Sequence, residues 1–226
     1  MSEISIEDLV NAANRQEAET NALLSKLEAQ LVNLSKAITL PVSEPAVALR
    51  EFVVAYINHV PNFISAVSFA AKDAGIDAYV MPFLEVATDY FVPAASENNG
   101  NPNLADLMQQ AYLAHRLIEE VNDQYIVRAS IPLIPMDITK ANVIVHHLLG
   151  ETLANSLDEV VEETARQMTN QNNVYSSEKF KEYVETRKGK GWDEVWKRWS
   201  DMTLSLAIDL DFEKKPTKTH TDDKPN

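Results

Sequence analysis

Apolar residues recur at alternating spacings of three and four along every long segment of this chain, and this feature constrains its fold more than any other. Such spacing places apolar side chains on one face of an α-helix, whereas a half-buried β-strand needs a spacing of two. Glycine is also scarce, with five among 226 residues, so the tight turns of a many-stranded sheet are largely missing. We therefore predict an all-α fold, a bundle of about seven or eight helices.

Capping residues, prolines and glycines divide the chain into eight expected helices. Their expected ranges are 5–38, 43–60, 62–74, 78–92, 104–128, 138–171, 177–188 and 192–210. Ser5 and Asp8 have the spacing of a capping box at the first helix start. Pro61 must kink or end the helix that reaches it, and Gly150 is a weak point or a close-packing site.

Three regions follow from this pattern. Residues 1–40 form an N-terminal helix with a partial coiled-coil seam, which we expect to project beyond the body or flank it. Residues 41–212 form the helical bundle domain, and the polar stretch 96–103 is the best internal place for a subdomain boundary. Residues 213–226 carry no apolar anchor and are expected to be a disordered tail.

Composition excludes several classes of function. Without cysteine there can be no disulfide, no thiolate nucleophile and no metal site that relies on sulfur ligands. The formal net charge of −14 disfavours direct binding to nucleic acids. No secretory signal and no apolar run of about 20 residues is evident, so we expect a cytoplasmic protein without a membrane span.

Pairs of acidic or histidine residues at a spacing of four are the candidate metal ligands, because helix bundles build metal sites from these residue types. The weak metal candidates are His115, Glu119, His147 and Glu151. A similar pair at residues 85 and 89 is expected to face water. His115 alone lies on the apolar face of its helix, with Asn122 one heptad later, and the two favour a satisfied internal hydrogen bond over an active site. Of the adjacent His146 and His147, we expect one to be buried and one exposed.

Two apolar surfaces are candidates for interaction. The first is the seam of Leu24, Leu27, Leu31, Leu34 and Ile38, and the second is the row of Trp192, Trp196 and Trp199 near the C-terminus. The seam must be buried somewhere, either on the chain's own bundle or between two chains. The tryptophans either anchor their helix on the bundle or bind a partner.

The chain has no nucleophile elbow and no phosphate-cradling glycine loop. We therefore expect a non-enzymatic helical protein without cofactors that acts through contact with a protein partner or as a homo-oligomer, self-associating through its N-terminal helix. One alternative is a bundle with an internal metal or small apolar ligand near His115. Another is a virion-associated or other structural adaptor, since residues 4–31 look faintly like the helical leader of some phage tail-fibre proteins.

Overall fold

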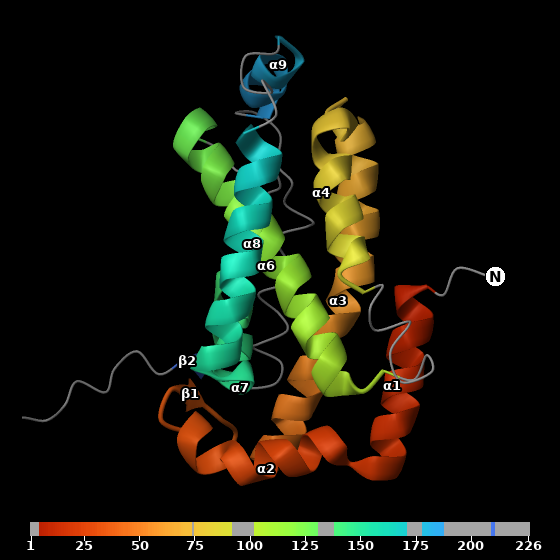
Figure 1. Cartoon of the computed structure of the whole chain (residues 1–226), viewed down its shortest axis with the longest axis vertical. Helices are drawn as coiled ribbons and strands as arrows, with labels where there is room; N and C mark the ends of the chain where they lie inside the picture. The colour runs from red at the N-terminus through yellow and green to blue at the C-terminus, as the bar shows by residue number, and fades with distance from the viewer. Residues whose placement is uncertain are drawn as a thin grey trace, which may run out of the picture.

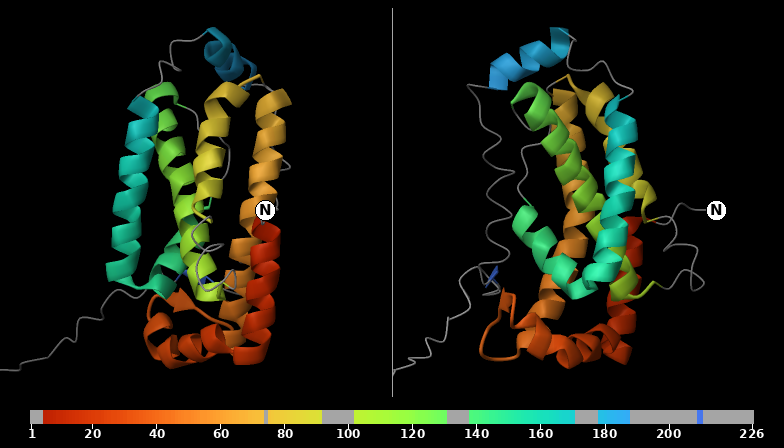
Figure 2. Two further views of the ribbon diagram at one scale, coloured as in Figure 1. Left: turned by 45° about the vertical axis from the view of Figure 1, so that its right-hand side comes forward. Right: turned by 60° about the vertical axis from the view of Figure 1, so that its left-hand side comes forward.

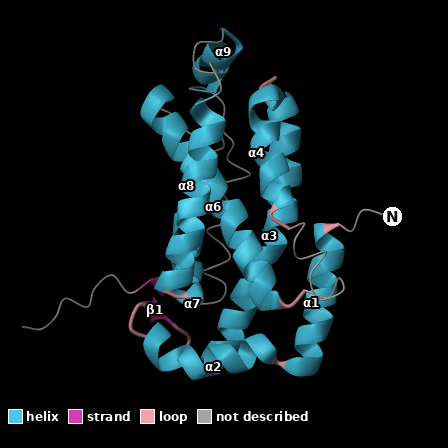
Figure 3. Ribbon diagram, viewed as in Figure 1, coloured by secondary structure: helices cyan, strands magenta, loops and turns pink. Residues whose placement is uncertain are grey.

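The computed structural model describes residues 5–73, 75–91, 102–130, 138–170, 178–187 and 209–210. Within these ranges 86% of the residues are helical, which confirms the predicted all-α fold. The helices are α1 (Ile6–Thr20), α2 (Ala22–Leu34), α3 (Pro45–Asp73), α4 (Asp77–Asp89), α6 (Leu104–Ala129), α7 (Thr139–Leu149), α8 (Glu151–Asn170) and α9 (Glu178–Arg187). The two strands, β1 (Ile38–Thr39) and β2 (Asp209–Leu210), have two residues each (Figure 3).

Helix α6 is the centre of the bundle, where it contacts α1, α3, α4, α7 and α8 (Figure 1). Helix α2 runs across one end of the bundle, which we call the base, and α9 lies across the opposite end in all three views (Figure 2). A single hydrophobic core extends from Leu9 in α1 to Tyr183 in α9. The N-terminal segment therefore shares the core of the bundle instead of projecting beyond it.

The predicted N-terminal helix is two helices joined at Asn21. Asn21 adopts a left-handed conformation with φ of 49°, which asparagine tolerates better than most residues. The buried carboxylate of Glu17 accepts hydrogen bonds from the backbone N–H groups of Leu23 and Leu24, at 2.9 and 3.0 Å. These two donors would otherwise be unsatisfied at the start of α2. A glutamate in the last turn of α1 thus caps the next helix and fixes the corner between them. The capping box of Ser5 and Asp8 is confirmed.

Helix α3 runs through Pro61, although the sequence left open whether the helix kinks or ends there. Buried side chains lie on both sides of the proline, with Val60 and Phe63 next to it, and packing on α6 holds the helix together. By length and composition, Pro45–Phe69 would suffice to cross a membrane, with a mean hydropathy of 1.3. This is weak evidence for a membrane span, since the core helices of soluble proteins meet the same criteria.

The predicted long helix 138–171 is also two helices, α7 and α8, which meet at Gly150. Gly150 has φ of 86° and ψ of 146°, a backbone conformation that side chains with a Cβ rarely adopt. The chain turns sharply there, and α7 contacts both α6 and α8. The turn brings residues from α7 and α8 to the same side of α6.

Replacing Gly150 by alanine should therefore destabilise the protein by about 1–3 kcal/mol, although nothing lies within 4 Å of the added Cβ. The cost comes from backbone strain and not from a steric clash. Urea unfolding followed by circular dichroism measures the change, with Gly75→Asn as the control, because asparagine tolerates a positive φ such as the 67° of Gly75. Equal losses in the two variants would contradict this explanation.

The strands correct one further expectation. We predicted a helix up to Leu210, but Asp209–Leu210 form β2, which pairs antiparallel with β1. Ile38 lies opposite Leu210, and Thr39 lies opposite Asp209. The predicted subdomain boundary at 96–103 falls mostly outside the described residues, and the predicted tail 213–226 falls outside them entirely.

Candidate functional site

A pair of histidines lies inside the bundle, where α3 packs on α6. Nδ1 of His59 is 3.1 Å from Nε2 of His115, so one imidazole donates a hydrogen bond to the other. Aromatic rings surround the pair, with ring centroids 4.3 Å from His115 for Tyr56 and 5.4 Å for Phe63. His115 is completely buried, and His59 is partly buried. We call these two residues the histidine pair.

Burial keeps the histidine pair neutral at physiological pH. It lowers the pKa of His115 to about 3, although a hydrogen bond to the backbone of Ala111 acts in the opposite direction. Burial, together with the neighbouring His115, lowers the pKa of His59 to about 2. A proton on either ring would place a charge in a low-dielectric interior. The pair is therefore a poor general base, because its rings bind a proton weakly, and a poor general acid at neutral pH, because its protonated form is hardly populated.

A chain of polar side chains continues from α3 to α7 and α6. The Tyr56 hydroxyl donates to Oδ1 of Asn142 over 2.7 Å, and Nδ2 of Asn142 donates to Oε2 of Glu119 over 2.7 Å. Both Tyr56 and Asn142 are buried. Burial raises the pKa of Tyr56 well above its ordinary value, assisted by the nearby Tyr112 and Glu119. Tyr56 therefore stays a neutral hydrogen-bond donor.

Arg116 joins this chain to α8. Its Nη1 donates to Oε2 of Glu119 over 2.6 Å, and its Nε donates to Oδ1 of Asp158 over 2.9 Å. The side chains of Arg116, Glu119 and Asp158 are 19%, 14% and 22% exposed. Burial acts to lower the pKa of Arg116, but the hydrogen bonds to the two carboxylates outweigh it and raise the pKa. One arginine is thus hydrogen-bonded to two carboxylates from different helices.

These hydrogen-bonded side chains form one set, which we call the polar network. Its members are Tyr56, Tyr112, Arg116, Glu119, Asn142 and Asp158. The Tyr112 hydroxyl donates to Oδ1 of Asp158 over 3.0 Å. His146 lies beside the network, with Nε2 3.2 Å from Oδ1 of Asn155 and 3.9 Å from the nearer oxygen of Asp158. The hydrogen bonds join α3, α6, α7 and α8. The arrangement is typical of an internal network that fixes how helices pack.

The metal candidates do not come together. His115 belongs to the histidine pair and Glu119 to the polar network, whereas His147 and Glu151 are exposed. Within the described ranges, no group of three or more His, Asp or Glu side chains could hold a metal ion. His115 makes an internal hydrogen bond, as predicted, and its partner is His59 in α3. Asn122 is itself buried. Residues 85 and 89 are exposed, as predicted.

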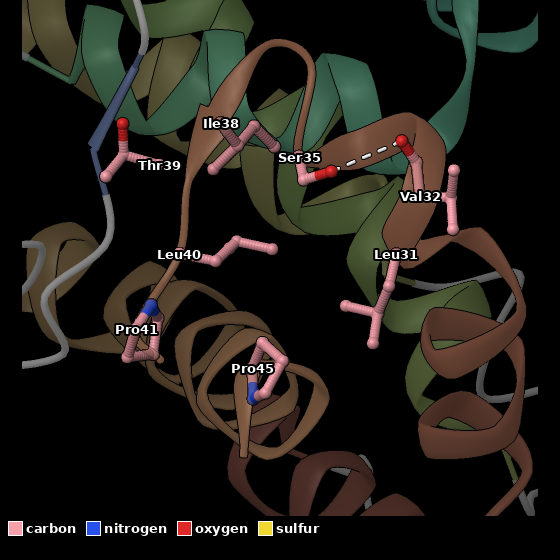
Figure 4. A pocket seen from close by; sticks show the side chains of 8 residues that line it. All are labelled: Leu31, Val32, Ser35, Ile38, Thr39, Leu40, Pro41 and Pro45. Atoms are coloured by element: carbon pink, nitrogen blue, oxygen red, sulfur yellow. Dashed lines mark hydrogen bonds between the residues drawn. The ribbon is translucent and has the colours of Figure 1, made fainter. Parts of the chain in front are cut away.

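A second candidate surface is an apolar groove at the base. It has a volume of about 470 Å³ between the end of α2, β1 and the start of α3. Its lining is Leu31, Val32, Ser35, Ile38, Thr39, Leu40, Pro41 and Pro45 (Figure 4). None of these side chains is ionisable. We call this feature the base groove.

Two exposed valines extend the apolar surface around the base groove. Val32 is 77% exposed, and Val42, in the loop after β1, is fully exposed. Figure 4 shows Ile38 and Leu40 pointing toward the side of Leu31, whereas Thr39 points to the opposite side of the strand. Val32 lines the base groove and Val42 directly follows the lining residue Pro41 in the chain, so exposed apolar side chains lie at the base groove in the described part of the structure.

The predicted interaction residues divide between the core and the base groove. Leu27 and Leu34 are buried, and Leu24 is partly buried against the core. Leu31 and Ile38 pack against the same core and also line the base groove. The seam is thus mainly covered within the chain, which was one of its two predicted fates. Trp192, Trp196 and Trp199 lie outside the described residues.

Sequence reasoning missed His59, Arg116 and Asn142 as members of a site. A signal for His59 was present, since Tyr56, His59 and Phe63 share one face at spacings of three and four if the helix continues through Pro61. The Arg116–Glu119 pair also has helical spacing. The contacts to Asn142 and Asp158 span 23 and 42 residues and follow no local pattern.

The fold and these two features define an all-α protein organised around one central helix, with a polar network inside and an apolar groove at one end. No family model matches the chain, and comparison with curated proteins and with solved structures gives no match either.

Proposed function

We propose that this chain is a non-enzymatic helical protein that acts through protein–protein contact and self-associates through the base groove. The observation that carries the proposal is the exposure of the apolar side chains of Val32 and Val42 at the base groove. Contiguous exposed apolar surface is typical of interaction sites, whereas single exposed apolar residues are common everywhere.

The charge of the chain restricts the surfaces at which a second copy can approach. Two copies with a net charge of −14 each repel one another over most of their surfaces. The lining of the base groove is uncharged, so two copies can approach there without placing carboxylates against each other. The groove also contains Leu31 and Ile38, two members of the seam for which the sequence suggested self-association.

The polar network supports a structural role in preference to a catalytic one. Its two carboxylates are both engaged by Arg116, and its tyrosine hydroxyls donate to Asn142 and Asp158. The rings of Tyr56, His59 and Phe63 pack around His115. No specific observation therefore favours the alternative of an internal ligand near this residue.

The test is self-association of the Val32→Glu/Val42→Glu variant. Sedimentation velocity at about 10–100 μM should show a dimer for the wild type and a monomer for the variant, because two glutamates add charge to an apolar contact. Circular dichroism should be unchanged, since both valines are exposed.

Val127→Glu is the matched control. Val127 is 84% exposed near the end of α6, away from the base, so this variant should still dimerise. A monomeric wild type at 100 μM, or equal loss of dimer in both variants, would overturn the proposal.

A further inference from the structure

The edge of β1 is held by a very short partner strand. β2 contributes two residues, Asp209 and Leu210, opposite Thr39 and Ile38. Strands in globular proteins usually have three to ten residues, and an isolated pair of strands is marginally stable at best. The pairing of β1 with β2 should therefore open at a small cost in free energy, well below that of global unfolding.

The partner strand β2 is separated by 21 residues from Arg187, where α9 ends. Because β2 pairs with β1 through two residues only, a free segment with the same sequence is expected to compete with it for the edge of β1.

The groove next to β1 offers apolar contact to a competing segment. Ile38 belongs to both β1 and the base groove, and Leu40 continues the same strand direction. A strand that pairs with an exposed sheet edge gains main-chain hydrogen bonds, and adjacent pockets provide side-chain contacts. In this chain, edge and pocket lie side by side (Figure 4).

We propose that the edge of β1 is a strand-accepting site, occupied by Asp209–Leu210 of the same chain or by the same segment of a second copy. This inference rests on the proposed self-association through the base groove and names the segment that a second copy contributes. The resident strand then limits access to the site, and exchange of strands links two copies.

The absence of cysteine allows a clean test in the full chain. Residues opposite each other in an antiparallel pair have Cα atoms about 4.5–5.5 Å apart, within the range that a disulfide bridges. The Thr39→Cys/Asp209→Cys variant should therefore close a disulfide within one chain, locking the resident strand when oxidised and releasing it when reduced. The probe is a fluorescein-labelled peptide with the sequence of residues 203–214, TLSLAIDLDFEK.

Fluorescence anisotropy should show the peptide binding to the reduced variant and at least tenfold weaker binding to the oxidised variant. The cysteine-free wild type should bind the peptide equally with and without reductant, and a peptide carrying Leu210→Pro should not bind, because proline cannot donate to the strand pairing. No binding to the reduced variant, or equal binding to both forms, would overturn the proposal.

Exchange between copies is tested by mixing two full-length single variants, Thr39→Cys and Asp209→Cys. A disulfide-linked dimer containing one of each is expected under oxidising conditions. If the wild type dimerises in sedimentation but this mixed dimer does not form, strand exchange is wrong while the proposed function stands. A monomeric wild type that still binds the peptide would remove the proposed function and leave the strand-accepting edge in place.

Discussion

Replacing Arg116 by methionine should destabilise the protein by roughly 3–5 kcal/mol. The Arg116 side chain is 19% exposed, and its guanidinium is hydrogen-bonded to both Glu119 and Asp158. Methionine fills a similar volume but leaves two largely buried carboxylates without their counter-charge. Urea unfolding followed by circular dichroism at pH 7 measures the loss.

Arg166→Met is the matched control, because Arg166 also pairs with a glutamate three residues away. Its side chain is 64% exposed and that of Glu163 is 47% exposed, so the unfolding free energy should change little. Adding Glu119→Gln and Asp158→Asn to Arg116→Met should restore part of the lost stability, since both stranded charges are removed. A triple variant no more stable than Arg116→Met would show that the loss arises from packing and not from uncompensated charge.

Acid should destabilise the protein through the histidine pair. The pKa values of about 2 for His59 and about 3 for His115 lie below the ordinary value of 6.5 that applies in the unfolded chain. The unfolded state therefore binds protons that the folded state excludes. The contribution of the pair to stability is complete above pH 6.5 and is lost as the pH falls from there toward 3. The unfolding free energy should fall by up to about 1.4 kcal/mol per pH unit for each histidine.

Urea unfolding between pH 7 and pH 5 measures this slope, in a range where most carboxylates remain ionised. The His59→Gln/His115→Gln variant should show a shallower slope even if it is less stable overall, because glutamine does not titrate. His147→Gln is the control variant, because His147 is exposed and lies outside the histidine pair. In NMR spectra of the folded wild type, the ring protons of His115 should not titrate between pH 8 and pH 5. An identical slope in the double variant would show that other groups cause the acid sensitivity.

The helical fold was predictable because helical periodicity is a local property of the sequence. The spacing of apolar residues, the capping box at Ser5 and the position of Pro45 at a helix start all act within a few residues. The sequence left the outcome open where distant packing decides between local alternatives. Pro61 permits either a kink or an end, and burial of residues on both sides against α6 keeps α3 continuous.

The sequence by itself determined the all-α class, the acidic charge, the absence of sulfur chemistry and the place of His115 on an apolar face. The tertiary structure decided what those features contact. His59 meets His115 across 56 residues, and Arg116 meets Asp158 across 42, because helix packing brings them together and no local spacing encodes such a meeting. The same holds for the seam, whose periodicity requires burial but does not say where. The corner at Asn21 turns α2 across the base. As a result, Leu27 and Leu34 enter the chain's own core, while Leu31 and Ile38 also line the base groove.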